Sequence, residues 1–281
     1  MYEIPEDRLP PGFVDTVLDP PARPAIPRPA ATLVLLRNAG PGPEVLLMRR
    51  HRASGFVPGA WVFPGGRVDS ADSGPALHER VHGLDSDPRP RSEYWVAALR
   101  ELFEETGVLL ARRDDGGWVG EAGDERRLEA LRRSLMEDRA AIGDVLDELD
   151  AVLDVSGVVH IAHWVTPVVE RRRYDTHFFA AGLPDRGVVR TDPREMVESC
   201  WLTPVEALAR FERRELPMVF PTVKTLESLR EYQSVEHVLD ALRGEPVPRV
   251  LPRLVRTAGG VAIVVDDEQA GAGGEARRPA G

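Results

Sequence analysis

The chain has 281 residues and a formal net charge of −10 at pH 7, with 46 acidic and 36 basic side chains. This balance argues against a general binder of nucleic acids or membrane surfaces, and the single cysteine, Cys200, excludes an internal disulfide. The sequence has neither an apolar run of 18 residues nor a signal-peptide pattern, so we expect a cytoplasmic protein with one substantial core and no membrane segment.

The first part of the chain predicts an arm followed by short strands. Residues 1–29 are rich in proline and lack periodicity, which is typical of an extended arm. Apolar runs bounded by turn residues then predict three strands, at 31–37, 44–50 and 61–63. The stretch 73–91 fits a turn or two of helix around 76–81.

The rest of the chain predicts strands and helices in an irregular order. Apolar residues at helical spacing indicate two accessory helices within 124–153. Strands are expected at 108–113, 158–167, 174–183, 196–204, 249–256 and 261–267, the second and third pairing as one hairpin and the last two as another. Further helices are expected up to about residue 213, at 221–232 and at 235–244. This mixture predicts an α/β fold with a mixed sheet between helices.

A helix predicted from Ser92 to Gly107 ends in the sequence RELFEETGV (100–108). Ser92 is a suitable N-cap, and Gly107 stands where helices usually stop. Three carboxylates near its end fall within an arc of about 100°: Glu101, Glu104 and Glu105. The apolar residues of the helix point roughly the opposite way, namely Val96, Leu99 and Phe103.

Two interpretations of this acidic face are open. Charge runs on helices are usually solvated, and like charges at i,i+4 then cost only a few tenths of a kcal/mol, about 0.2–0.5. If water is partly excluded, the cost rises towards about 4 kcal/mol per close pair, and the face needs a cation. An all-oxygen ligand set of this kind suits Mg²⁺ or Mn²⁺.

The sequence around the carboxylates decides between these interpretations. Residues 100–108 fit the pattern R-E-apolar-x-E-E-x-G-apolar at every specified position. This pattern resembles the second half of the Nudix box, the signature of hydrolases that cleave a diphosphate linked to another moiety. The resemblance implies an α/β/α sandwich with a mixed sheet, plus accessory helices, in which the box forms a loop, a helix and a loop.

A first half of the box lies upstream in WVFPGGRVDSADSG (61–74). Asp72 stands six residues after Gly66, where the family pattern has Glu, so the carboxylate is kept on a shorter side chain. Between Asp72 and Arg100 the chain has 27 residues instead of seven, an insertion of 20. We therefore expect replacement of Asp72 by Asn to cost much less activity than replacement of a helix glutamate.

Several segments between residues 31 and 228 follow the order of one Nudix branch, which has an insertion inside the box and whose animal members are coenzyme A diphosphatases. The resemblance implies cleavage of coenzyme A or acyl-coenzyme A to 3′,5′-ADP and 4′-phosphopantetheine. NADH, ADP-ribose and nucleotide sugars are alternative substrates. A non-catalytic module that senses a nucleotide is an alternative of another class, although such a module does not need three metal-binding carboxylates.

The resemblance also implies roles for individual residues. Glu101, Glu104 and Glu105 would bind Mg²⁺ or Mn²⁺, with Glu104 as the third ligand. Arg100 would orient these carboxylates by pairing with one of them. Gly65 and Gly66 would let the loop backbone approach the helix carboxylates and the substrate closely.

The general base comes from different places within the superfamily. Glu195, on the loop before a strand, is the first candidate, and Glu198 and Glu104 are the others. Arg171 and its two arginine neighbours could contact the 3′-phosphate of coenzyme A, and Arg50 is a similar candidate beside Arg49. Arginines in turns are usually solvated, so both interpretations stay open for them.

Other chemically capable residues are expected to be structural. His160 and His163 alternate on a predicted strand and are expected to pack in the core, and Cys200 is expected to be a buried small side chain. The expected partner is a small nucleotide-derived substrate, with no nucleic acid and no membrane. We divide the chain into an arm, a Nudix hydrolase domain, a C-terminal helix and hairpin, and a disordered tail. The arm is 1–29, and the hydrolase domain is 30–232, with the box parts at 66–72 and 100–108 and the insert at 124–153. The C-terminal helix and hairpin are 233–267, and the tail is 268–281.

Overall fold

The computed structural model describes residues 2–40, 42–51, 57–85, 89–120, 125–185, 187–191 and 196–265. These residues build a central sheet of eight strands in the order β11-β3-β2-β10-β9-β12, with β4 paired to β3 and β5 paired to β2. The sheet is mixed, because β10 runs parallel to β2 and β12 runs parallel to β9, whereas the other neighbours are antiparallel. Its strands are β2 (Arg28–Ala39), β3 (Gly42–Arg50), β4 (Trp61–Val62), β5 (Gly65–Arg67), β9 (Val158–Val165), β10 (Tyr174–Gly182), β11 (Met196–Leu202) and β12 (Arg249–Val250).

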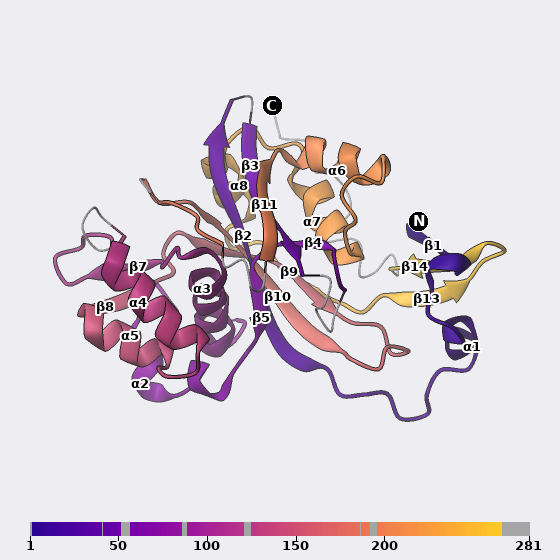
Figure 1. Cartoon of the computed structure of the whole chain (residues 1–281), viewed down its shortest axis with the longest axis horizontal. Helices are drawn as coiled ribbons and strands as arrows, with labels where there is room; N and C mark the ends of the chain where they lie inside the picture. The colour runs from indigo at the N-terminus through magenta and orange to yellow at the C-terminus, as the bar shows by residue number, and fades with distance from the viewer. Residues whose placement is uncertain are drawn as a thin grey trace.

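Helices cover both faces of this sheet (Figure 1). One face carries α2 (Pro75–His78), α3 (Ser92–Thr106), α4 (Glu125–Met136) and α5 (Ile142–Leu149). The other face carries α6 (Pro204–Glu212), α7 (Phe220–Leu229) and α8 (Val235–Leu242). The predicted α/β sandwich with a mixed sheet is therefore confirmed.

The alternation of side chains along β2 and β3 explains why the sheet has two covered faces. On β2, Leu33 and Leu35 pack in the core on the α3 side, whereas Val34 and Leu36 pack in the core on the α7 and α8 side. Successive strand residues point to opposite faces, so an apolar run without polar interruptions must be covered twice. All four of these side chains are fully buried.

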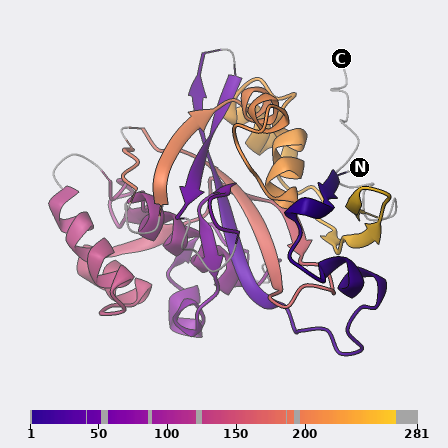
Figure 2. The ribbon, with the colours of Figure 1, turned by 45° about the vertical axis from the view of Figure 1, so that its right-hand side comes forward.

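Two smaller sheets flank the central one. The sheet β6-β8-β7 lies beside the α3 layer and is formed by Val81–His82, Ala151–Asp154 and Ala111–Arg113. The sheet β1-β14-β13 joins Tyr2–Pro5, Gly260–Val264 and Arg253–Arg256, and Figure 2 shows it beside α1 (Phe13–Leu18) at the N-terminal end. The described residues also form the 3-10 helices η1 (Glu6–Arg8) and η2 (Ser70–Asp72).

Most predicted elements are confirmed, but three predictions about the arm, a helix start and a strand differ from the structure. The stretch 1–29 is not a plain extended arm, because β1 pairs with β14 and α1 forms a short helix. Ser92 is the first helical residue rather than the N-cap, a position that Arg91 occupies without a side-chain hydrogen bond. Only Ala111–Arg113 of the predicted strand 108–113 pairs with a neighbour.

The late hairpin is confirmed for β13 and β14, whereas Arg249–Val250 of the predicted strand 249–256 forms a separate strand that pairs with β9. The predicted tail 268–281 lies outside the described residues. The division of the chain into an arm, a hydrolase domain and a C-terminal unit stays a prediction. Within the described ranges, no helix is both long and apolar enough to cross a membrane.

Candidate active site

Helix α3 places the three predicted carboxylates at the edge of the core. It ends at Gly107, whose left-handed backbone (φ 74°) lets its N–H donate to the Phe103 carbonyl at 2.8 Å. The carboxylate face is not solvated, since Glu105 is only 5% exposed and the side chains of Glu101 and Glu104 are 14% and 20% exposed. Such burial of like charges is costly unless cations compensate it.

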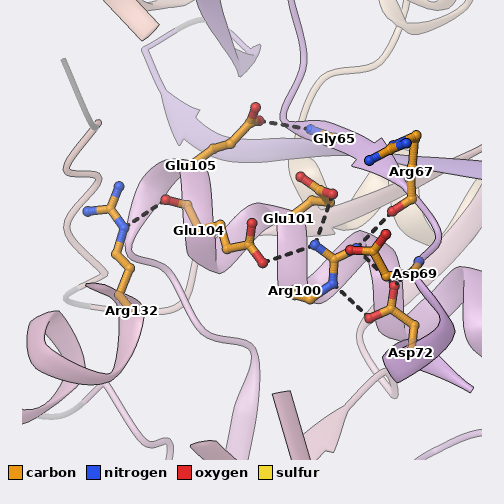
Figure 3. Close-up of polar contacts among 9 residues, drawn as sticks. All are labelled: Gly65, Arg67, Asp69, Asp72, Arg100, Glu101, Glu104, Glu105 and Arg132. Carbon is orange, nitrogen blue, oxygen red and sulfur yellow. Dashed lines mark hydrogen bonds and ion pairs between the residues drawn. The ribbon is translucent and has the colours of Figure 1, made fainter. Parts of the chain in front are cut away.

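Arg100 is the cation at the centre of this cluster (Figure 3). It donates two hydrogen bonds to Asp72, from Nε to Oδ1 at 2.7 Å and from Nη2 to Oδ2 at 2.8 Å. Its Nη1 donates to Glu101 and to Glu104, each at 2.9 Å, and its Nη2 also donates to the Arg67 carbonyl at 2.8 Å. The guanidinium therefore holds the helix carboxylates and the upstream loop in one array.

The electrostatics of the array favour a bound cation. Burial alone would lower the pKa of Arg100, but its hydrogen bonds to Asp72 and the nearby carboxylate charges outweigh burial and raise that pKa. Burial raises the pKa of Glu101 to about 7, and the charges of Glu104 and Asp72 add to the rise against the opposing effect of Arg100. Among the described contacts, the carboxylates that Arg100 joins outnumber this one guanidinium, and such an oxygen-only ligand set fits Mg²⁺ or Mn²⁺.

The glycine loop approaches the helix as closely as the sequence suggests. The N–H of Gly65 donates to Glu105 Oε2 at 2.9 Å. A Cβ added to Gly66 would lie 2.4 Å from Glu101 Oε1, a distance that real side chains do not adopt. Pairing of β5 with β2 fixes the loop in this position. The close backbone approach is therefore present, while contact of these glycines with substrate stays a prediction.

Asp72 has a more central place than the sequence suggests. It is 1% exposed, and its Oδ2 also accepts a hydrogen bond from the Asp69 N–H at 2.8 Å within η2. The 20-residue insertion that follows contains α2 and β6 and returns to α3 without separating Asp72 from Arg100. The shorter carboxylate is thus a direct partner of the box arginine, and the expectation that Asp72→Asn costs much less activity than replacement of a helix glutamate stays a prediction.

An accessory helix supplies one further residue that the sequence analysis did not single out. Arg132 of α4 is 4% exposed, and its Nε donates to the Glu104 carbonyl at 2.8 Å. Arg132 lies four residues after Leu128, on the apolar face of the predicted helix, and that position was the available signal. The helical insert therefore contacts the box helix at its last turn.

The remaining predicted residues lie further from the array or outside the described part of the chain. Glu195 falls in the range 192–195, outside the described residues. Glu198 of β11 is exposed and pairs with Arg49 at 3.5 Å. Arg50 is half-buried at the end of β3, opposite Met196, and Arg171 is exposed in the turn after β9. The catalytic and substrate roles of all these residues stay predictions.

Two predicted structural residues have unexpected neighbours. His160 and His163 are half-buried, but they contact a third histidine, His177, and not only apolar side chains. Burial, together with the other histidines, lowers the pKa of His160 to about 4 and that of His177 to about 2. Cys200 is half-buried and partly surrounded by charged side chains, and burial raises its pKa to about 11.

Comparisons with known proteins agree with this geometry. Residues 85–229 match the family of the NUDT19 Nudix domain, and residues 26–123 match the NUDIX domain. The acyl-coenzyme A diphosphatase NUDT19 of Gallus gallus is 28% identical over 86% of this chain and 79% of its own length. The human protein of the same name is 27% identical over 81% of this chain and 72% of its own length.

A solved structure gives the same result for the fold. The crystal structure of a NUDIX hydrolase from Alicyclobacillus acidocaldarius has 30% sequence identity and a TM-score of 0.68, covering 79% of this chain and 99% of that chain. These matches confirm that the protein is an enzyme, a hydrolase that acts on diphosphate bonds. From its box residues, its fold and these matches, the chain belongs to the family of the NUDT19 Nudix domain.

Proposed function

We propose that this hydrolase cleaves the diphosphate bridge of coenzyme A or of an acyl-coenzyme A. Water adds to one phosphorus atom and the bridging P–O bond breaks, which releases 3′,5′-ADP and 4′-phosphopantetheine or its acyl form. The relatives named acyl-coenzyme A diphosphatase support this substrate class. The observation that carries the reaction type is the set of buried carboxylates that Arg100 holds together. We further propose that the reaction takes place in the cytoplasm.

Glu101, Glu104 and Glu105 are the residues that would hold Mg²⁺ or Mn²⁺. When bound, such an ion polarises the phosphoryl oxygens and lowers the pKa of a coordinated water molecule. Arg100 keeps Glu101 and Glu104 in position through its Nη1, and the Gly65 N–H orients Glu105. Hydrogen bonds of this kind would hold the carboxylates in one arrangement, so that little rearrangement is needed during the reaction.

Three carboxylates remain candidates for the general base: Glu195, Glu198 and Glu104. Glu195 is the first choice from the family resemblance. Glu104 already accepts a hydrogen bond from Arg100 through Oε1, which disfavours proton transfer to that oxygen. Replacing each residue by Gln and measuring kcat against pH separates them, since loss of the base lowers kcat and removes the acidic limb of the profile.

The substrate proposal is tested with purified protein and Mg²⁺ or Mn²⁺ by chromatography of the products. We expect a higher kcat/KM for coenzyme A than for NADH, ADP-ribose or a nucleotide sugar. Arg171→Gln should raise KM for coenzyme A and leave that for dephospho-coenzyme A unchanged, if this arginine contacts the 3′-phosphate. Equal turnover of coenzyme A and dephospho-coenzyme A by the wild type would remove the argument for a contact with the 3′-phosphate. Turnover of ADP-ribose or a nucleotide sugar alone would overturn the substrate proposal.

A further inference from the structure

Strands β9 and β10 bring two histidines and an aspartate to one face of the central sheet. His177 stands directly opposite His163 in the antiparallel register, and Asp175 precedes His177 by two residues. Residues two apart on a strand share a face, and directly opposite residues share it too. The Tyr94 ring of α3 packs edge-on against His177 with centroids 4.4 Å apart, so this face is the one that α3 covers.

The side chains of this cluster converge. One potential ligand atom from each of His163, Asp175 and His177 lies within 4.8 Å of the other two. The Nε2 of His163 contacts Asp175 Oδ1, and the rings of His163 and His177 stack with centroids 3.8 Å apart. Two ligands about 2.1 Å from one tetrahedral ion stand roughly 3.4 Å apart, so small side-chain rotations would bring the three atoms onto one ion.

A fourth residue, His160, contacts the cluster through the ring of His177. His160 Nε2 lies 2.9 Å from Nδ1 of His177. With Nδ1 engaged in this way, the Nε2 of His177 is the nitrogen left for another partner. Histidines that bind metals usually have their second nitrogen held by such a hydrogen bond. The neutral imidazole is the form of histidine that binds metals.

We propose that His163, Asp175 and His177 form a second metal site, which binds a transition-metal ion such as Zn²⁺ with His160 as the orienting residue. Two imidazole nitrogens and one carboxylate favour Zn²⁺ and similar ions over Mg²⁺. The Nudix box presents only oxygen ligands and therefore has the opposite preference. Three protein ligands leave a coordination position for water or another small ligand.

This site shares no residue with the box, although both lie on the α3 side of the sheet. Its ligands come from β9 and β10, whereas the box carboxylates come from α3 and η2. Tyr94, which packs on His177, precedes Glu101 by seven residues, about 10 Å along the helix. An ion held here would tie the β9–β10 hairpin together beside the first turns of the box helix.

The test is metal binding by the full chain, purified without a polyhistidine tag and stripped with a chelator. Zn²⁺ is titrated by calorimetry in excess Mg²⁺, and Co²⁺ is titrated in parallel, with its visible absorption as the signal. We expect one Zn²⁺ per chain and a Co²⁺ spectrum with nitrogen ligands. His177→Gln and Asp175→Asn should each weaken Zn²⁺ binding at least tenfold, which is the usual loss on removing a ligand or its support.

Two matched variants keep the result interpretable. Exposed His82 lies outside the cluster, so His82→Gln should leave the affinity unchanged, and Glu105→Gln should do the same because it alters only the box. A thermal melt of each variant establishes folding. Asp175, which is more exposed than His177, provides a second ligand variant if His177→Gln does not fold. The proposal is overturned if the wild type binds no Zn²⁺ under excess Mg²⁺, or if binding survives in Asp175→Asn and His177→Gln or is lost in Glu105→Gln.

Discussion

Asp72 and Arg100 form a buried, bidentate ion pair, with N–O distances of 2.7 and 2.8 Å. The pair joins the two parts of the Nudix box on either side of the insertion. Both residues are almost fully buried, at 1% and 5% exposure. A buried guanidinium that loses its charged partner is strongly destabilising. The pair therefore connects the first half of the box to the helix despite the longer connection between them.

We predict that Asp72→Asn lowers the free energy of unfolding by about 1–3 kcal/mol, the usual cost of a weakened buried hydrogen bond to a charge. Activity should fall at least tenfold, because Arg100 loses the partner that orients it. Asp69→Asn is the matched control, since Asp69 is 57% exposed and lies 3.7 Å from Arg100. Urea unfolding and kcat measure both effects. Equal behaviour of the two variants would show that the buried pair is unimportant.

The second prediction concerns the glycine loop. Gly66→Ala would place a Cβ 2.4 Å from Glu101 Oε1, so that carboxylate or the loop must move. We expect kcat to fall by about 100-fold or more, the scale of loss when catalytic groups shift by an ångström. A thermal melt should still show a folded protein.

The control for this variant is Gly143→Ala. Gly143 lies in α5, and an added Cβ there meets no atom within 4 Å. Alanine should stabilise that helix by about 0.5–1 kcal/mol and leave kcat unchanged. Wild-type kcat in Gly66→Ala would contradict the close approach of loop and carboxylate.

The third prediction follows from the pKa of Cys200, which burial raises from 9 to about 11. The thiolate is the reactive form, and its population changes about tenfold per pH unit below the pKa. Alkylation of the native protein at pH 8 should therefore be about 100-fold slower than that of the urea-unfolded chain.

Alkylation rates measured against pH test this directly, since the chain has no other cysteine. The rate for the unfolded chain should level off just above pH 9, whereas the native rate should keep rising beyond pH 10. A native plateau at or below pH 9 would contradict the raised pKa and would reopen Cys200 as a reactive residue.

Local patterns explain which parts of the fold were predictable. The helix with Glu101, Glu104 and Glu105 follows from apolar spacing and from a terminal glycine, and β2 and β3 follow from continuous apolar runs. Such signals depend on neighbours within one or two turns. Arg91 rather than Ser92 is the N-cap, a difference of one residue that sequence signals at helix ends do not resolve.

Long-range pairing explains what the sequence did not predict. Part of the expected arm is a strand, because Tyr2 pairs with Ile263 of β14. The local sequence does not predict this pairing. The ion pair of Asp72 with Arg100 likewise depends on how the insertion folds back. His163 was expected to be a core residue, and its contact with His177 was not predicted because that contact requires the register of two strands.

The most direct test of the proposed metal site in the Nudix box is Glu105→Gln, which keeps side-chain volume and removes one charge from the buried array. We predict a loss in kcat of about 10³-fold or more, equivalent to about 4 kcal/mol. The metal-free protein should melt at the wild-type temperature or above it, because repulsion among the carboxylates is relieved, and Mn²⁺ should no longer raise that temperature. Glu101→Gln should behave similarly.

Glu93→Gln is the matched control, because Glu93 lies in the first turn of the same helix, pairs with Arg91 and is outside the box. The deciding measurement is kcat of Glu105→Gln beside that of Glu93→Gln, at saturating substrate and Mn²⁺. If Glu105 holds the metal, Glu93→Gln should keep near wild-type turnover, and Glu105→Gln should lose at least about 10³-fold in kcat. Wild-type turnover in Glu105→Gln would contradict this role of Glu105.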